Sequence, residues 1–350
     1  MTRPRPRPDL EGLAPYSTSD SGAGRIFLHA NENPYPLPSS VMGEIVEATT
    51  SLELNRYPSV GAGAALAREL ASYADVDPEW IWIGDGSNEV LLQACLAYGG
   101  PGRTALLFHP TYAMHYRQPR MAGTNVEVCP RGSDFAIELD AALKSIETMR
   151  PDIVFVCSPN NPTGTVTPAA DIIAMADDAP GLVIVDEAYF EFCGETIVPK
   201  LGELPNVLVV RTMSKAFRLA GLRVGYGIAN PDLLSAMRSV RMPYAQSSFT
   251  QMAALVVLRR RDEVLDKVDE IIAERERIAR ELARGAEVFP SRANFVLFRP
   301  RDADALLVAL AERGIVIRDF RKLGAEGCLR VTVGLPSEND EFLEVAADLR

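Results

Sequence analysis

Short runs of consecutive apolar residues recur along the first two thirds of the chain. They read IWIG from residue 81, TALLF from 104, VEVC from 126, IVFVC from 153, LVIVD from 182 and VLVVR from 207. Most lack the apolar–polar alternation of a strand with one wet face, so they predict strands buried on both faces. Segments of helical periodicity lie between them, such as NEVLLQACLAY and PAADIIAMADDA. Alternating strands and helices predict an α/β fold, a mostly parallel sheet with helices on both faces.

The pattern changes after Pro243. A charge-rich stretch of helical periodicity runs from about 247 to 284, and short strand patterns follow in ANFVLF, GIVIR and CLRVTV. This mixture predicts a second, smaller α/β domain. The proline-rich NENPYPLP at 31–38 predicts an extended connector. We therefore expect an N-terminal arm and connector at 1–38, a large domain at 39–246 and a small C-terminal domain at 247–350.

Length, charge and composition narrow the class of protein. The 350 residues fit two domains, and the net charge of −11 argues against a nucleic acid or an anionic membrane as partner. No stretch reaches the roughly 18 apolar residues of a membrane span. No apolar segment follows the basic start MTRPRPRPDL, so we expect no signal peptide. Five scattered cysteines favour reduced thiols in the cytoplasm, and the three histidines lack metal-ligand spacing, so no metal is expected.

Chemically distinctive residues follow directly after several of the predicted strands. Ligands of open α/β sheets bind outside the carboxyl ends of the strands, so these residues are expected to meet there. The residues in question are Gly86, Ser87, Asn88, Asn161, Asp186, Thr212, Ser214 and Lys215. Each has a plainer interpretation as a cap, a turn former or a surface side chain.

One ligand, a phosphorylated aromatic aldehyde, accounts for these residues together. Lys215 can form a Schiff base with the aldehyde. A buried Asp186 needs a cationic partner, which a pyridinium nitrogen supplies. The helix start at Ser87 and Asn88 favours a phosphate, and Arg223 adds a charge-assisted hydrogen bond. The set predicts a pyridoxal phosphate site. A nicotinamide site is the competing interpretation, but GDGSNE, GAGAAL and GYGIAN each lack the third glycine of its fingerprint.

A series of motifs makes the chain resemble a known family. In order they are NENPYP, RYP, GSNE, PTYAMH, SPNNPTG, VDEAYFEF, TMSKAFRLAGLRVGY, PSRANFVLF and LRVTVG. The resemblance extends from about LAPY at residue 13 to LRVTVG at residue 329. The chain resembles the fold-type I, aspartate-aminotransferase-like pyridoxal phosphate enzymes, and most of all the histidinol-phosphate aminotransferase family. By resemblance to the wider fold type, a cis peptide bond is expected before Pro162.

The resemblance assigns a role to each residue of the cofactor site. It implies that Lys215 carries the cofactor and shuttles a proton, and that Asp186 keeps the ring nitrogen protonated. It implies that Asn161 and Tyr189 hydrogen-bond the ring oxygen and that Tyr112 stacks on the ring. Gly86 would lie at the same site, and the phosphate would be held by Ser87, Asn88, Thr212, Ser214 and Arg223.

The resemblance also implies a homodimer and a substrate pocket. Tyr57 of the RYP motif would reach the phosphate in the partner subunit. Arg330 would bind the anionic end of the substrate. The pocket would be completed by Tyr16, Tyr244 and Arg318. The segment DFRKLGAEG after Arg318 is variable in the family, so Arg321 could replace or assist Arg318.

The expected reaction is amino transfer from histidinol phosphate to 2-oxoglutarate, giving imidazole acetol phosphate and glutamate in histidine biosynthesis. Two alternatives stay open on the same scaffold, a phenylalanine (aromatic amino acid) aminotransferase and a phosphothreonine decarboxylase. A pyridoxal-phosphate-binding regulator would carry an added DNA-binding domain, for which 350 residues and a net charge of −11 leave no room.

Overall fold

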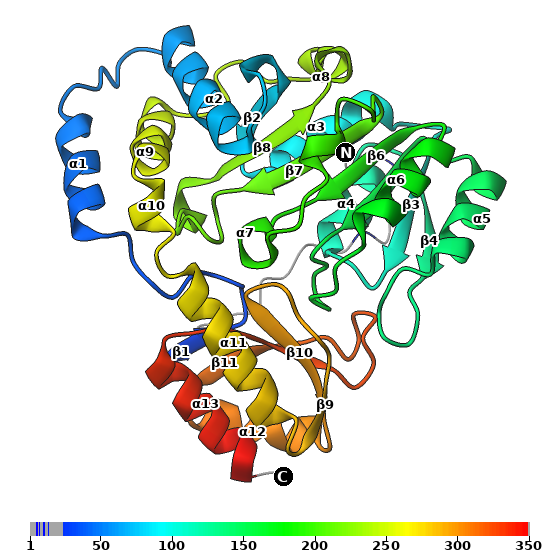
Figure 1. Ribbon diagram of the computed structural model, residues 1–350, viewed down its shortest axis with the longest axis vertical. Helices are drawn as coiled ribbons and strands as arrows, with labels where there is room; N and C mark the ends of the chain where they lie inside the picture. Colours follow the sequence, from blue (N-terminus) through cyan, green and yellow to red (C-terminus); the bar gives the residue numbers. More distant parts are fainter. Residues whose placement is uncertain (1–4, 6, 8–9, 11–12, 14–23, 349–350) are drawn as a thin grey trace.

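The computed structural model describes residues 24–348 together with residues 5, 7, 10 and 13. The described residues form two sheets with helices packed around them (Figure 1). The expected α/β fold, with a large and a smaller sheet, is confirmed. None of the described helices is long and apolar enough to span a bilayer.

The larger sheet has the strand order β2-β8-β7-β6-β5-β3-β4. Its strands are β2 (Ile81–Asp85), β3 (Thr104–His109), β4 (Asn125–Pro130), β5 (Ile153–Cys157), β6 (Leu182–Asp186), β7 (Val207–Thr212) and β8 (Val224–Ala229). Only β8 among them runs antiparallel to its neighbours. The other six therefore direct their carboxyl ends to the same edge of the sheet.

Both faces of this sheet are covered, which explains the unbroken apolar runs. On β6, Val183 and Val185 belong to one core, whereas Leu182 and Ile184 belong to the core of the opposite face. Successive side chains of a strand point to opposite faces, so a doubly covered strand needs apolar residues at every position.

The helices before Ser248 are α1 (Ser39–Thr49), α2 (Val60–Ala74), α3 (Ser87–Tyr98), α4 (Ala113–Met121), α5 (Leu139–Met149), α6 (Ala169–Asp178), α7 (Phe190–Cys193) and α8 (Pro231–Arg238), with 3₁₀ turns η2 (Pro78–Trp80), η3 (Val198–Lys200) and η4 (Ala220–Leu222).

The smaller sheet has the order β1-β11-β12-β10-β9. Its strands are β1 (Ile26–Leu28), β9 (Ala286–Val288), β10 (Phe295–Pro300), β11 (Ile315–Asp319) and β12 (Leu329–Thr332). Helices α11 (Val268–Leu282), α12 (Ala303–Glu312) and α13 (Pro336–Asp348) pack with it, as the lower half of Figure 1 shows. Strand β1 comes from the N-terminal part of the chain and pairs in parallel with β11.

The segments next to the two expected domain boundaries, near residues 38 and 247, pack differently from the expectation. The charge-rich stretch from 247 consists of α9 (Ser248–Arg259), α10 (Arg261–Val264) and α11 rather than one helix. Helix α9 packs on α1 and α2, and its Ala253 and Val257 lie in the core of the larger sheet. The expected connector at 1–38 contains β1, a strand of the smaller sheet. We therefore propose that the large domain extends to about Leu265 and that β1 belongs to the small domain.

Strand β8 was not expected because its sequence, VGYGIA, contains two glycines. A Cβ on Gly225 would lie 2.0 Å from the backbone nitrogen of Ser87, so only glycine lets the start of α3 approach the strand this closely.

The expected cis bond before Pro162 is confirmed, and the bonds before Pro110 and Pro159 are cis as well.

Candidate active site

The sequence-predicted residues meet at the carboxyl-end edge of the larger sheet. Gly86 and Ser87 follow β2, Asn161 follows β5, Asp186 ends β6, and Ser214 and Lys215 follow β7. The parallel direction of these four strands brings together residues that are far apart in sequence. The expected gathering at one edge is therefore confirmed.

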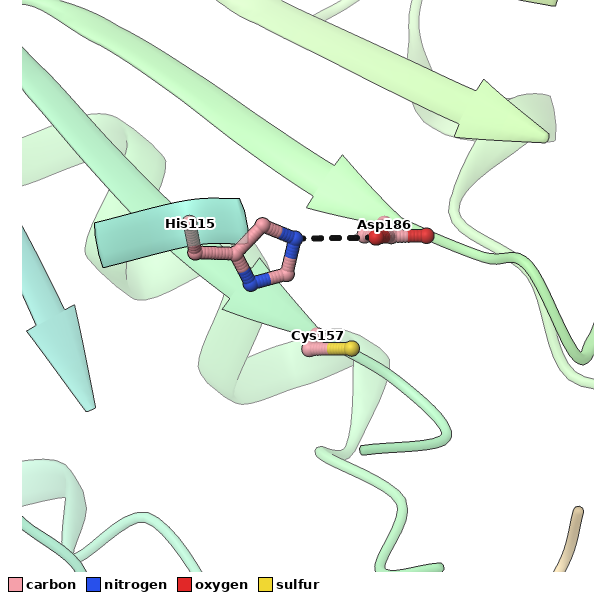
Figure 2. Close-up of side chains that lie close together, drawn as sticks. All are labelled: His115, Cys157 and Asp186. Atoms are coloured by element: carbon pink, nitrogen blue, oxygen red, sulfur yellow. Dashed lines mark hydrogen bonds and ion pairs between the residues drawn. The ribbon is translucent and has the colours of Figure 1, made fainter. Parts of the chain in front are cut away.

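Asp186 is buried and hydrogen-bonded on both carboxylate oxygens. Its Oδ1 accepts the backbone N–H of Ala188 at 3.1 Å, and its Oδ2 lies 2.9 Å from Nε2 of the fully buried His115 (Figure 2). A carboxylate only accepts, so His115 Nε2 donates. His115 Nδ1 lies 3.1 Å from the Thr111 hydroxyl, and the imidazole stacks on Phe155 with ring centroids 5.0 Å apart. This environment fixes the orientation of the Asp186 carboxylate.

His115 is a site residue that sequence reasoning missed. It lies in the quoted motif PTYAMH, but the histidines were considered only as metal ligands, and Asp186 is 71 residues away. Ligand atoms of His115, Cys157 and Asp186 do lie within 4.8 Å of one another. Within this cluster, His115 Nε2 already donates to Asp186 Oδ2 at 2.9 Å.

Lys215 lies in the turn after β7, and its Nζ donates to the backbone oxygen of Ala30 at 3.1 Å. Although the side chain is not fully enclosed, its pKa is lowered from 10.5 to about 8, chiefly by burial and next by the charge of Arg330. The carboxylates of Glu32 and Asp186 act in the opposite direction. At pH 7 roughly a tenth of the Lys215 side chains are therefore neutral, nucleophilic amines, far more than for a solvated lysine.

This lowered pKa predicts how the protein without cofactor reacts with pyridoxal phosphate. A base with a lowered pKa loses its proton earlier as pH rises, so the capture rate should climb with pH and level off above about 8. Rapid mixing with the cofactor, followed by absorbance, gives this rate at each pH. A profile that is still rising near pH 10, as for a solvated lysine, would contradict the prediction.

Tyr189 and Asn161 face each other in a network closed by Asn31 and Arg330. The Tyr189 hydroxyl accepts from Asn31 Nδ2 at 2.8 Å and from Asn161 Nδ2 at 3.4 Å. Arg330 donates from Nη1 to Asn161 Oδ1 and from Nη2 to the His29 oxygen at 2.6 Å. Burial raises the pKa of the Tyr189 phenol above its usual range, so the hydroxyl keeps its proton and can donate to a ligand.

Arg330 lies on the inner side of β12, as the alternation of CLRVTV predicts. Leu329 and Val331 belong to the small-domain core, whereas Arg330 and Thr332 point to the other face and are buried there. The Arg330 guanidinium carbon lies over the Phe295 and Phe320 rings, 5.1 and 5.0 Å from their centroids. An exposed strand arginine, the plainer interpretation, is ruled out.

Hydroxyl groups and one guanidinium surround the start of α3. The Thr212 hydroxyl donates to Ser214 Oγ at 2.9 Å, and Arg223 Nη1 donates to the same Oγ at 3.3 Å. Gly86 has φ +78°, and a Cβ there would lie 2.4 Å from Arg223 Nη2. Glycine therefore leaves room for the guanidinium beside the free N–H groups of the helix start. On the same helix, Asn88 Oδ1 accepts the Tyr112 hydroxyl at 3.2 Å.

The residues predicted to bind the substrate lie in different surroundings. Arg318 lies directly opposite Arg330 in the β11–β12 register. Arg321 instead donates to Asp319 and to Asp304, the latter at 2.7 Å. Two carboxylates therefore hold Arg321, and Arg318 is the better candidate for the pocket. Tyr16 lies outside the described residues.

Tyr57 and Tyr244 are not placed among the other site residues. Their rings stack on each other, with centroids 4.3 Å apart. Both side chains are exposed in the single chain.

A buried ion pair beneath the site was also missed. Arg211 Nε donates to Glu187 Oε2 at 2.9 Å, and Arg211 Nη2 donates to the Thr196 hydroxyl at 2.7 Å. The guanidinium carbon lies 3.7 Å from the centroid of the Phe190 ring. Both partners immediately neighbour site residues, Asp186 and Thr212, so the pair holds the ends of β6 and β7 together. Sequence alone showed only an arginine at the end of an apolar run.

Arg211→Ala is expected to lower the free energy of unfolding by about 3–5 kcal/mol, because it leaves Glu187 buried without its countercharge. Urea unfolding followed by circular dichroism measures this change. Arg259→Ala is the matched control, since its ion pair with Glu69 is exposed and should contribute at most about 1 kcal/mol. Equal losses in the two variants would contradict the prediction.

Comparison with known proteins decides the family. The family model for aminotransferase class I and II matches residues 24–345. The chain belongs to this family. Among curated relatives, the histidinol-phosphate aminotransferase of Corynebacterium efficiens is 44% identical over 98% of this chain and 94% of its own length. That of Thermoanaerobacter sp. (strain X514) is 41% identical over 98% of each chain.

Among solved structures, histidinol-phosphate aminotransferase from Sinorhizobium meliloti, in complex with pyridoxal-5'-phosphate, superposes on this aminotransferase-family chain with a TM-score of 0.89. It is 25% identical and covers 100% of this chain and 99% of that one. The expected resemblance to fold-type I aminotransferases is confirmed.

Proposed function

We propose that this family member is a pyridoxal-phosphate-dependent aminotransferase that uses histidinol phosphate and 2-oxoglutarate and forms imidazole acetol phosphate and glutamate. The observation that carries the substrate is the 44% identity, over nearly all of both chains, to a protein named histidinol-phosphate aminotransferase. All five cysteines are free and buried, which fits the cytoplasm as its location.

The residues at the strand ends fit pyridoxal phosphate. Gly86 lets the Arg223 guanidinium lie close to the start of α3, and the groups gathered there are hydroxyls, backbone N–H groups and this guanidinium, which suit a phosphate. The buried carboxylate of Asp186 ends β6, and Lys215, whose pKa is lowered, follows the neighbouring strand β7. When bound, the cofactor supplies an electron sink for the carbon that carries the amino group.

Each residue then has a defined task. Asp186, oriented by His115, holds a proton on the ring nitrogen. Tyr189 and Asn161 hydrogen-bond the ring oxygen. Lys215 Nζ takes the proton from Cα of the amino donor, which its lowered pKa permits near neutral pH. Arg330 binds the anionic end of the donor and then that of the keto acid.

A comparison of three amino donors tests the proposed substrate. Histidinol phosphate, phenylalanine and phosphothreonine are each supplied with 2-oxoglutarate, and glutamate and carbon dioxide are measured. The proposal expects the highest kcat/KM for histidinol phosphate, with glutamate as product. A preference for phenylalanine would identify an aromatic aminotransferase, and carbon dioxide release from phosphothreonine a decarboxylase.

We further propose a homodimer in which Tyr57 works in the partner's site. Exposed apolar side chains in the two segments that the Tyr57–Tyr244 contact brings together support a subunit contact there; they are Leu54, Tyr57, Met242 and Tyr244. Hybrid dimers of Lys215→Ala and Tyr57→Phe subunits should hold one complete site and exceed both parents in activity. Two affinity tags allow the hybrids to be purified. Hybrids no more active than their parents, or a monomer by light scattering, would refute this arrangement.

A further inference from the structure

Three basic side chains lie in a row across the smaller sheet. Arg318 of β11 is directly opposite Arg330 of β12. Strands β1 and β11 run parallel with Leu28 beside Ile317, so the next position along each strand places His29 beside Arg318. Leu28 and Ile317 belong to the small-domain core. Successive side chains of a strand point to opposite faces, so His29, Arg318 and Arg330 share the other face of the sheet.

This face is turned toward the active site. Arg330 donates from Nη1 to Asn161 Oδ1 and from Nη2 to the backbone oxygen of His29 at 2.6 Å. The residue after His29, Ala30, accepts a hydrogen bond from Lys215 Nζ at 3.1 Å. The backbone of His29 is therefore held between the residue that binds the anionic end of the substrate and the lysine that moves the proton.

The side chains of the row have unused hydrogen-bonding groups. His29 Nδ1 is buried, and no described residue forms a hydrogen bond with it. Arg318 likewise has no hydrogen bond or ion pair with any residue between 24 and 348. Buried polar atoms usually have a partner, because leaving them unpaired is unfavourable. A polar ligand on this face of the sheet would supply one.

The protonation of the His29 imidazole depends on the charges around it. Its pKa is lowered, chiefly by burial; the Glu32 carboxylate acts in the opposite direction, and the guanidinium groups of Arg318 and Arg330 lower the pKa further. Lys215, which donates to Ala30, is the other charged group beside this segment. The imidazole is therefore mostly neutral at pH 7 before a substrate binds. A bound anion reverses this, because a neighbouring negative charge favours the imidazolium.

The two substrates bring different charges to this face. A phosphate monoester has a second pKa near 6, so it is mostly a dianion at pH 7.5, whereas a carboxylate carries one negative charge. Arginine stays protonated at any working pH and cannot adjust to the ligand. Histidine can, since its charge changes close to neutral pH.

We propose that His29 is a specificity residue for the phosphorylated amino donor: its imidazole takes up a proton from solvent when the phosphate dianion binds beside Arg318 and Arg330, and it stays neutral when the carboxylate of the keto acid binds there. This inference rests on the proposed function. The positive charge of the site then follows the negative charge of the ligand, and one site serves both half-reactions.

His29→Asn is expected to raise the KM for histidinol phosphate about tenfold at pH 7, the effect of losing one hydrogen bond to a charged group. The KM for 2-oxoglutarate should stay within threefold of wild type. His29→Gln should behave in the same way, because neither amide can be protonated. A similar rise for both substrates would mean that His29 only positions Arg330, and it would overturn the proposal.

His109→Asn is the matched control. His109 also has a lowered pKa, chiefly from burial, but it lies at the end of β3 in the large domain and outside the row. Both of its KM values should stay at the wild-type level. A rise in the KM for histidinol phosphate equal to that of His29→Asn would show that the effect is not specific to the row.

The pH dependence separates a charged His29 from a neutral one. The imidazolium is lost as pH rises, so wild type should lose its advantage over His29→Asn in the KM for histidinol phosphate between pH 7 and 9. Changes at other groups are common to both proteins and cancel in the ratio of the two KM values. A ratio that stays constant over this range would contradict proton uptake by His29.

Calorimetry measures the proton directly, without turnover. The protein with bound cofactor is titrated with inorganic phosphate, or with glutarate as the carboxylate, at pH 7.5 in two buffers of different ionisation enthalpy. With phosphate, wild type should take up as much as one proton per site more than His29→Asn; with glutarate the two should agree. Equal uptake with phosphate would overturn the proposal.

The proposed function and this inference fail in different ways. A wild-type preference for phenylalanine over histidinol phosphate would refute the proposed function. A wild-type preference for histidinol phosphate, together with an unchanged KM for it in His29→Asn and His29→Gln, would overturn the role of His29 alone.

Discussion

Lys215→Ala is expected to lower the rate of amino transfer by at least about 10²–10⁴-fold, the range that general acid–base catalysis supplies. The substitution removes the amine that carries the cofactor and moves the proton. Steady-state turnover measures the loss. Borohydride treatment of the wild-type protein, followed by peptide mass spectrometry, should find the cofactor on Lys215 and on no other lysine.

Lys200→Ala is the control for this change, since Lys200 is half exposed and pairs with Glu203. It should retain wild-type turnover and the covalent link at Lys215. A cofactor attached to a different lysine, or Lys215→Ala turnover within tenfold of wild type, would remove Lys215 from its assigned role.

Arg330→Ala is expected to raise the KM for both histidinol phosphate and 2-oxoglutarate by roughly thirtyfold or more. Loss of a buried, charged hydrogen-bonded contact costs about 2–5 kcal/mol. The substitution also removes the donor to Asn161 Oδ1, so binding of the cofactor ring should weaken as well. Arg330→Lys should recover little, because an ammonium cannot present two parallel donors.

Arg321→Ala is the matched control for Arg330, because two carboxylates already hold this guanidinium. Its KM values should stay within threefold of wild type. Each half-reaction is followed separately by the absorbance of the cofactor. A change below threefold for Arg330→Ala in both half-reactions would show that another group binds the anion.

The parts of the fold that the sequence predicted are those with a repeated physical signal. Doubly buried strands such as β5 and β6 need apolar residues throughout, and that requirement is visible in one sequence. Strand β8 lacks the signal because Gly225 and Gly227 leave room for neighbouring groups. Strand β1 has three residues, and its membership of the smaller sheet depends on a partner near the other end of the chain.

The residues of the candidate site likewise include some that the sequence predicted and some that it did not. Asp186 and Lys215 were predictable because the end of a parallel strand is where ligands bind. His115 and the Arg211–Glu187 pair were not, because their roles come from contacts that only the folded chain creates. A residue that acts by positioning a site residue need not occur at any fixed spacing from it in the sequence.

The pairing of β1 with β11 has a consequence for the order in which the chain is made. Ile26 and Leu28 emerge from the ribosome long before their partners Ile315 and Ile317, because the whole larger sheet is synthesised between them. The large domain can fold on the growing chain in the meantime, since domains generally fold as units during synthesis. Through that interval the first strand is an apolar segment without a sheet to join. The small domain can therefore close only once β11 has been synthesised, and it closes with a strand that was made long before.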